Sequence, residues 1–273
     1  MDAFNHTSST EGPNSTVYSE KEQRTLFDLE QNSWWFKYRA RVIVGLMRRY
    51  YNNKVPTIDV GGGNGYTTFV AAQNGFAMEL LEPSSSACEH ARERGITSTC
   101  GMLSDDYPPD SSYGQVLLLD VMEHIEDDDA FLDLIKRKMT KGGLLLITVP
   151  ACMSLWNSQD EYAGHFRRYS IESLNRTIKR AGLKVLYENY FFSFLYLPHF
   201  IGRRLMERLG FLKRNEERTD EERNKIINRQ FRLKKGSHIL RIIELLEKME
   251  YGRLMKNKKL LLGSSLVAIV KKE

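Results

Sequence analysis

Short apolar segments alternate with helical patterns along most of this chain, and this alternation restricts the fold more than any other feature. The segments are apolar almost throughout, as in 116–119, which is typical of strands covered on both faces of a parallel sheet. The expected strands lie at 57–60, 78–82, 97–100, 116–120, 144–149, 183–189 and 265–270, and the expected helices between them at 65–74, 84–94, 128–139 and 170–181. We therefore predict a doubly wound α/β fold.

The rest of the chain adds to this core. Its 273 residues suit one domain with a sizeable insertion. Residues 1–16, rich in Ser, Thr and Asn, are expected to be a disordered tail. Residues 17–54 should form N-terminal helices that cap a site in the core, which spans 55–193. Helical spacing at 194–258 predicts an insertion or lid, after which 259–273 supplies the closing strand.

Cysteine usage and hydropathy suggest a location. The three cysteines form no C-x-x-C pair, so we predict neither a zinc site nor a disulfide framework, and a reducing compartment is the simplest interpretation. The N-terminus has no apolar leader, and no apolar run approaches the ~18 residues of a spanning helix. We expect a cytoplasmic protein.

Charge is unevenly distributed. The chain carries a net charge of +5, but residues 203–260 hold 18 Lys and Arg against 9 Asp and Glu. This segment could face phosphates or anionic lipid, or could be a solvated helical surface of mixed charge. The aromatic segment 191–197, followed by Arg203 and Arg204, leaves a peripheral membrane contact open, although a lid helix or buried surface explains it equally. We expect no nucleic-acid partner.

A glycine-rich loop follows the first expected strand and opens a helix. Gly61, Gly63 and Gly65 come directly after Asp59, in the crevice where doubly wound sheets bind ligands. Glu82 ends the second strand, where a carboxylate can accept both hydroxyl hydrogens of a ribose. A dinucleotide fingerprint would need its third glycine at Tyr66. S-adenosylmethionine instead offers an ammonium group, which an acid at Asp59 suits.

Three segments carry a family resemblance. They are Asp59 to Gly65, Leu81-Glu82-Pro83, and the run from Leu119 to Ile125 continuing through 141–143 to Pro150. In this order and spacing the chain resembles class I S-adenosylmethionine-dependent methyltransferases of the small-molecule type over about 55–190. The resemblance implies a Rossmann-like sheet of seven strands with the last one antiparallel. It also implies methyl transfer to oxygen or nitrogen of a small-molecule acceptor.

The resemblance also implies cofactor contacts. Asp59 and the backbone of the glycine loop would hold the methionine end, although Asp59 could simply cap the turn. Glu82 would hold the ribose, or could cap the next helix. Met102 and Leu103 would lie against adenine or could be plain packing. Asp120 would border the sulfonium, and Trp35 and Arg39 could close over the cofactor.

Candidate acceptor-side residues follow the fifth strand. Asp160, His165 and Tyr169 belong to an Asp…Gly-His-x-Arg-x-Tyr run that, with an early Trp-Trp-Phe…Arg, resembles a subset of these enzymes found with glycan or lipid-linked substrates. The ordinary pKa of histidine suits His165 to act as a base, with Asp160 and Tyr169 as further catalytic candidates. These side chains could instead anchor the loop to the sheet.

Two further alternatives complete the hypotheses. Asp120, Glu123 and His124 could bind a divalent metal, as in some relatives, but nothing else in the sequence completes a ligand set, so we predict no metal. A nucleotide-binding oxidoreductase, which the loop spacing disfavours, and a non-catalytic scaffold remain rivals to the methyltransferase.

Overall fold

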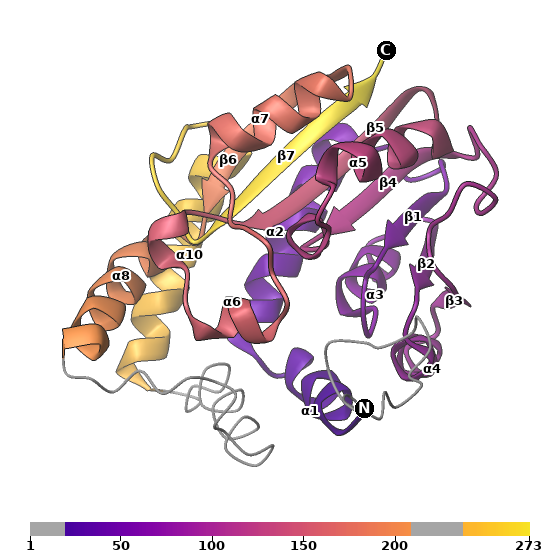
Figure 1. Ribbon diagram of the computed structural model, residues 1–273. Helices are drawn as coiled ribbons and strands as arrows, with labels where there is room; N and C mark the ends of the chain where they lie inside the picture. The colour runs from indigo at the N-terminus through magenta and orange to yellow at the C-terminus, as the bar shows by residue number, and fades with distance from the viewer. Residues whose placement is uncertain (1–19, 209–236) are drawn as a thin grey trace, which may run out of the picture.

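Seven strands form one sheet in the computed structural model, which describes residues 20–208 and 237–273 (Figure 1). The strands are β1 (Thr57–Val60), β2 (Met78–Glu82), β3 (Thr97–Cys100), β4 (Tyr113–Leu119), β5 (Met139–Pro150), β6 (Leu183–Phe191) and β7 (Ser265–Lys272). Their order is β3-β2-β1-β4-β5-β7-β6, and β7 runs antiparallel to both of its neighbours. The predicted doubly wound sheet with an antiparallel last strand is confirmed. The predicted tail at 1–16 and the middle of the insertion lie outside the described residues.

Helices cover both faces of the sheet. They are α1 (Glu20–Glu30), α2 (Trp34–Tyr50), α3 (Tyr66–Gln73), α4 (Ser85–Glu93), α5 (Asp128–Lys138), α6 (Ser158–Tyr162), α7 (Ile171–Arg180), α8 (Ser193–Arg208) and α10 (His238–Met255), with short 3-10 helices η1 (Met122–His124) and η2 (Met153–Leu155). Alternate residues of β4 face opposite ways, as the pleat requires. Val116 and Leu118 pack with α5 and α7, and Leu117 and Leu119 pack with α2, α3 and α10. The apolar run is therefore buried on two sides.

The fifth strand begins earlier than the sequence predicts. We expected a helix to 139, a turn at 141–143 and a strand from 144, whereas β5 starts at Met139. Its pairing with β4 jumps from Met139 to Leu144, which marks a bulge. A Cβ on Gly143 would lie 2.9 Å from the carbonyl oxygen of Thr140, so the backbone passes too closely there for a side chain. The glycines make a bulge within the strand rather than a turn before it.

A buried carboxylate ties the N-terminal helices to the insertion. Glu250 of α10 accepts a hydrogen bond from the hydroxyl of Tyr38 in α2, at 2.7 Å. It also accepts from the backbone nitrogens of Phe192 and Ser193, at 2.8 and 2.6 Å, where β6 passes into α8. Because the donors lie in α2 and at the start of α8 while the acceptor lies in α10, these hydrogen bonds hold the three helices together beside the sheet.

The aromatic segment 191–197 begins in the core. Phe191 and Phe192 are fully buried, so this part of the run is packing rather than a membrane-facing surface. Exposed apolar side chains start only at Leu197, which is 62% exposed. Among the described helices, none combines the length and the apolar character needed to cross a bilayer.

Candidate functional site

A cavity of about 430 Å³ lies at the carboxyl ends of the central strands, where ligands bind in doubly wound sheets. Figure 1 shows α1 and α6 beyond the strand ends on this side of the sheet. The lining comes from the glycine loop, α1, α2, η1, the loop around α6, and α8. Its polar members and glycines include Glu30, Arg39, Gly61, Gly62, Gly63, Asp120, Glu123, His124, Gln159, Asp160, His165, Arg168 and His199.

The glycine loop presents its backbone to the cavity. Gly61, Gly63 and Gly65 have φ values of 71°, 57° and 72°, a region that side chains disfavour. A Cβ on Gly61 would lie 2.8 Å from Cγ2 of Val121. The prediction that glycine is needed here for positive φ is confirmed, and of the three predicted glycines Gly61 and Gly63 reach the lining.

Asp59 lies beneath this loop. It is 1% exposed, and its Oδ2 accepts a hydrogen bond of 2.6 Å from the hydroxyl of Thr68. Its Oδ1 is buried without a hydrogen-bond partner among the described residues. Burial raises the pKa of Asp59 to about 6, although the Thr68 hydrogen bond and nearby Arg39 lower it. Oδ1 of Asp59 is thus a buried acceptor left unsatisfied beneath the glycine loop.

Glu82 braces the loop from the next strand. One oxygen accepts from the backbone nitrogen of Gly63 at 2.9 Å, and the other accepts from Ser84 at 3.0 Å. Burial raises the pKa of this carboxyl. Met102 is 58% exposed and Leu103 packs against the core. Like Asp59 and Glu82, neither is among the cavity-lining residues.

Arg39 and Asp120 form an ion pair across the cavity wall. Nη2 of Arg39 lies 2.7 Å from Oδ2 of Asp120, and both side chains are largely buried. The hydroxyl of Thr148 donates to Oδ1 of Asp120 at 2.9 Å. Beside them Trp35 stacks on Phe192, with ring centroids 5.3 Å apart. Trp35 and Arg39 of α2 and Asp120 thus line the same cavity, although Asp120 lies far from the other two in the sequence.

Asp160 orients His165, another residue of the cavity lining. Nδ1 of His165 and Oδ1 of Asp160 are 2.9 Å apart, and Nε of Arg168 donates to the same oxygen at 2.8 Å. Asp160 is 1% exposed, and burial alone would raise its pKa. Hydrogen bonds from His165 and Arg168 outweigh burial and hold the pKa of Asp160 below its usual value. Asp160 is therefore an ionised partner for the imidazole.

Tyr169 is buried away from the cavity lining. Its side chain is 2% exposed and is not among the cavity-lining residues. Its hydroxyl donates to Oδ2 of Asp128 at 2.7 Å, and its backbone bridges Ala151. Of the three predicted catalytic residues, Asp160 and His165 come together at the cavity, and Tyr169 anchors the loop that carries them.

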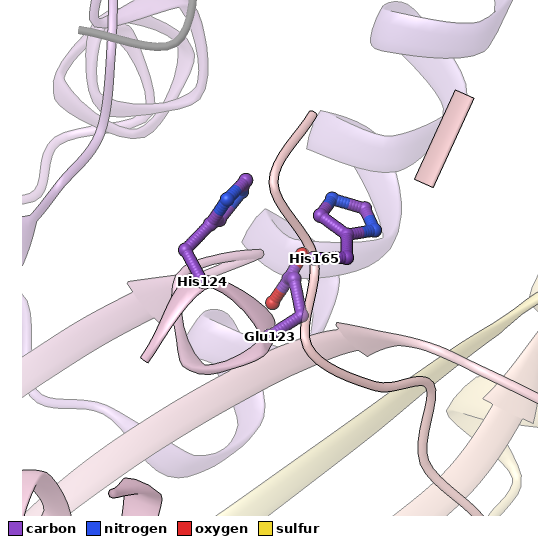
Figure 2. A group of neighbouring side chains, drawn as sticks. All are labelled: Glu123, His124 and His165. Atoms are coloured by element: carbon purple, nitrogen blue, oxygen red, sulfur yellow. The ribbon is translucent and has the colours of Figure 1, made fainter. Parts of the chain in front are cut away.

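Glu123 and His124 lie beside this pair. Their ligating atoms and that of His165 are all within 4.8 Å of one another, and in Figure 2 the Glu123 carboxylate lies between the two imidazole rings. Burial lowers the pKa of His124 to about 4. Burial and the neighbouring Asp120 carboxylate raise the pKa of Glu123. The metal set considered from the sequence contained Asp120, but that carboxylate pairs with Arg39, and the described group contains His165 in its place.

Residues 35–188 match the model of a family described as methyltransferase domain. The chain belongs to this family. Over 167 residues this methyltransferase domain is 25% identical to a Mycolicibacterium smegmatis protein named "Probable S-adenosylmethionine-dependent methyltransferase", covering 60% of the chain and 64% of the relative. It is 26% identical over 149 residues to a ubiquinone biosynthesis O-methyltransferase of Rickettsia bellii, covering 47% and 62%. The matches thus span somewhat under two thirds of these relatives.

A solved structure of an S-adenosylmethionine-dependent methyltransferase from Thermotoga maritima shares the fold of this methyltransferase domain. Its TM-score is 0.52 at 17% identity, with 93% of this chain and 96% of the other covered. Together with the family match, this confirms the predicted class I architecture.

Glu30 and His199 are among the residues of the methyltransferase domain's cavity that sequence reasoning missed. Glu30 comes from α1 and His199 from α8, both outside the segments that carry the family motifs. The helical spacing of α1 predicted a helix, but no local signal showed which of its residues would reach the site. His199 follows the aromatic segment 191–197, for which the sequence left a lid helix, buried surface and membrane contact open, and the placement of α8 brings it to the cavity.

Proposed function

We propose that the chain transfers a methyl group from S-adenosylmethionine to a hydroxyl oxygen of a small-molecule acceptor. The observation that carries the proposal is that His165, oriented by an ionised Asp160, lines the same cavity as the glycine loop and Asp120. The family match supports the reaction class, and a relative named as an O-methyltransferase favours oxygen over nitrogen.

The residues at the glycine loop fit the cofactor. The unpartnered Oδ1 of Asp59 suits an ammonium group, and the open backbone of Gly61 and Gly63 admits a close approach. Glu82 would accept from the ribose hydroxyls, while Trp35 and the Arg39–Asp120 pair would close the opposite side. The cofactor supplies an electrophilic methyl group on a sulfonium, so this chain's part is alignment and handling of the acceptor proton.

His165 is placed to assist the loss of that proton. Since Nδ1 faces Asp160, the other ring nitrogen, Nε2, is left for the acceptor side. A hydroxyl is a poor nucleophile until its proton is withdrawn, and such assistance typically contributes about 10²–10⁴-fold to the rate. Asp160 keeps the ring in one orientation and stabilises its charged form.

The test measures S-adenosylhomocysteine formation with a panel of hydroxyl and amine acceptors. We expect His165→Ala to lower turnover at least about 100-fold while the Kd for S-adenosylmethionine, measured by calorimetry, stays within about twofold. The matched control is His238→Ala at the exposed start of α10, which should change neither quantity. Full turnover in His165→Ala would contradict the acceptor-side assignment.

Cofactor choice separates the proposal from its oxidoreductase and scaffold rivals. Tyr66 occupies the place of the third dinucleotide glycine and begins α3, so its side chain stands at the helix N-terminus where a pyrophosphate would sit. We expect calorimetry to show binding of S-adenosylmethionine and none of NAD. The reverse result would overturn the proposal, and cofactor binding without product from any acceptor would favour the scaffold.

A further inference from the structure

We propose that Glu123, His124 and His165 bind a divalent transition-metal ion at the acceptor side of the cavity. One carboxylate and two imidazoles place their ligating atoms within 4.8 Å of one another. Glu123 and His124 come from η1 after β4, and His165 comes from the loop after α6, so two separate segments converge on one point (Figure 2). All three residues line the cavity.

Glu123 supplies an independent sign that a cation belongs here. Its side chain is 1% exposed, and Oε2 accepts no hydrogen bond from any described residue. Asp120 and Asp160 lie close enough to repel its charge. The nearby Arg39 is paired with Asp120 at 2.7 Å. Because a buried carboxylate without a partner is costly, a cation against Oε2 would satisfy a group that the described protein leaves unsatisfied.

The two imidazoles are held as metal-binding histidines usually are. Nδ1 of His165 faces Oδ1 of Asp160 at 2.9 Å, and the backbone carbonyl of Ala163 accepts a hydrogen bond from His124. Each ring therefore has one nitrogen tied to an oxygen acceptor and the other left for an ion, which is the arrangement that orients ligating histidines in metalloproteins. The rings lie 4.7 Å apart, centroid to centroid, at 80° to each other.

The ligand types select the class of ion. Two nitrogens and one carboxylate suit Zn²⁺, Fe²⁺, Co²⁺ or Mn²⁺, whereas Ca²⁺ and Mg²⁺ prefer oxygen throughout. Around an ion at ~2.1 Å, tetrahedral ligand atoms lie about 3.4 Å apart, so binding would draw the group together by small side-chain rotations. Three protein ligands leave a coordination position directed to the cavity. The prediction of no metal from the sequence is replaced here by a testable site.

The role of the ion, though not its binding, rests on the proposed methyl transfer. With the ion bound, His165 would be its ligand and no longer the base, and the cation would instead lower the pKa of the acceptor hydroxyl so that its proton passes to water. The oxygen lone pair then forms the bond to the methyl carbon while the carbon–sulfur bond of the sulfonium breaks. In this state His165 holds the ion, and Asp160 fixes the ring as before.

The experiment measures metal binding without reference to activity. The full chain, dialysed against a chelator, is titrated with Co²⁺ and followed by visible absorption, and with Zn²⁺ in a calorimeter. We expect one equivalent of Co²⁺ with visible bands of nitrogen and oxygen ligation. Glu123→Gln and His124→Ala should each weaken binding at least about tenfold, whereas His238→Ala should bind as the wild type does.

Several outcomes decide the proposal. The proposal would be overturned if Glu123→Gln and His124→Ala bound Co²⁺ as tightly as the wild type does. An intense near-ultraviolet thiolate band would also overturn it, because it would assign the ion to cysteine. Retained S-adenosylmethionine affinity in both variants shows that they are folded. Co²⁺ binding through these residues without any methyl transfer supports the site and contradicts the proposed function. If the chain binds no Co²⁺ and a chelator leaves methyl transfer unchanged, the metal site is overturned while the proposed function stands.

Discussion

Asp59→Asn should alter the pH dependence of stability in a defined direction. The substitution keeps the shape of the side chain and an oxygen that can accept from Thr68, but removes the titrating carboxyl. In the wild type, burial raises the pKa of Asp59 from 3.8 to about 6. The folded state therefore holds the proton more tightly than the unfolded state. The free energy of unfolding should fall as pH rises from about 4 to about 6, and then stay level.

The magnitude follows from the shift. About two pKa units at 1.36 kcal/mol each amount to about 3 kcal/mol over the whole range. Between pH 5 and pH 8, a folded pKa of about 6 and an unfolded pKa of 3.8 leave about 1.4 kcal/mol. The variant lacks this contribution. Its difference in stability from the wild type should therefore shift by that amount, with the wild type relatively more stable at pH 5.

Urea unfolding of both chains at pH 5 and pH 8 measures the difference. Other titrating groups cancel because they are common to the two proteins. A difference that is the same at both pH values would refute a desolvated carboxyl at Asp59. A shift of opposite sign would show that the folded protein stabilises the charged form. If the cofactor ammonium approaches this carboxylate, wild-type affinity for S-adenosylmethionine should rise from pH 5 to pH 7, and the variant should lack that rise.

Four further substitutions test the site and its support. Glu82→Ala should weaken S-adenosylmethionine binding by about 1–3 kcal/mol in calorimetry, and unchanged affinity would remove the ribose role. Gly61→Ala should lower the thermal midpoint of unfolding more than Gly63→Ala does. Both glycines have positive φ, but only a Cβ on Gly61 would lie 2.8 Å from Val121. Equal effects would exclude this clash as the cause. Glu250→Gln should cost about 2 kcal/mol in urea unfolding, since its hydrogen bonds lose their charge; an unchanged midpoint would show that they contribute little.

The fold could be predicted because its signals are local. The strands around Leu117 and Val267 are apolar enough to be recognised alone, and strand–helix alternation then restricts their connections. The bulge at Gly143 was missed because glycines before a strand and glycines within one look alike in a sequence. Only the pairing with β4 distinguishes the two.

Site residues that are close together in the sequence could be predicted to lie together in space, whereas the contacts between distant residues could not. Asp59 and the glycine loop occupy one turn, so their proximity follows from the chain itself. His124 and His165 are separated by α5, β5, two short helices and a loop, and their proximity depends on how that loop folds back. For the same reason the pairing of Arg39 with Asp120 was not foreseen. It explains why Asp120 does not join the metal ligands.

The buried carboxylate of Glu250 has a mechanical consequence for access to the cavity. It binds the Phe192 backbone, and the ring of Phe192 carries the stacked Trp35 that forms part of the cavity wall. Displacing the tryptophan would therefore break that stacking or move the junction between β6 and α8, which Glu250 holds to α10. A shift of α10 would in turn reach this part of the cavity wall through Glu250 and Phe192.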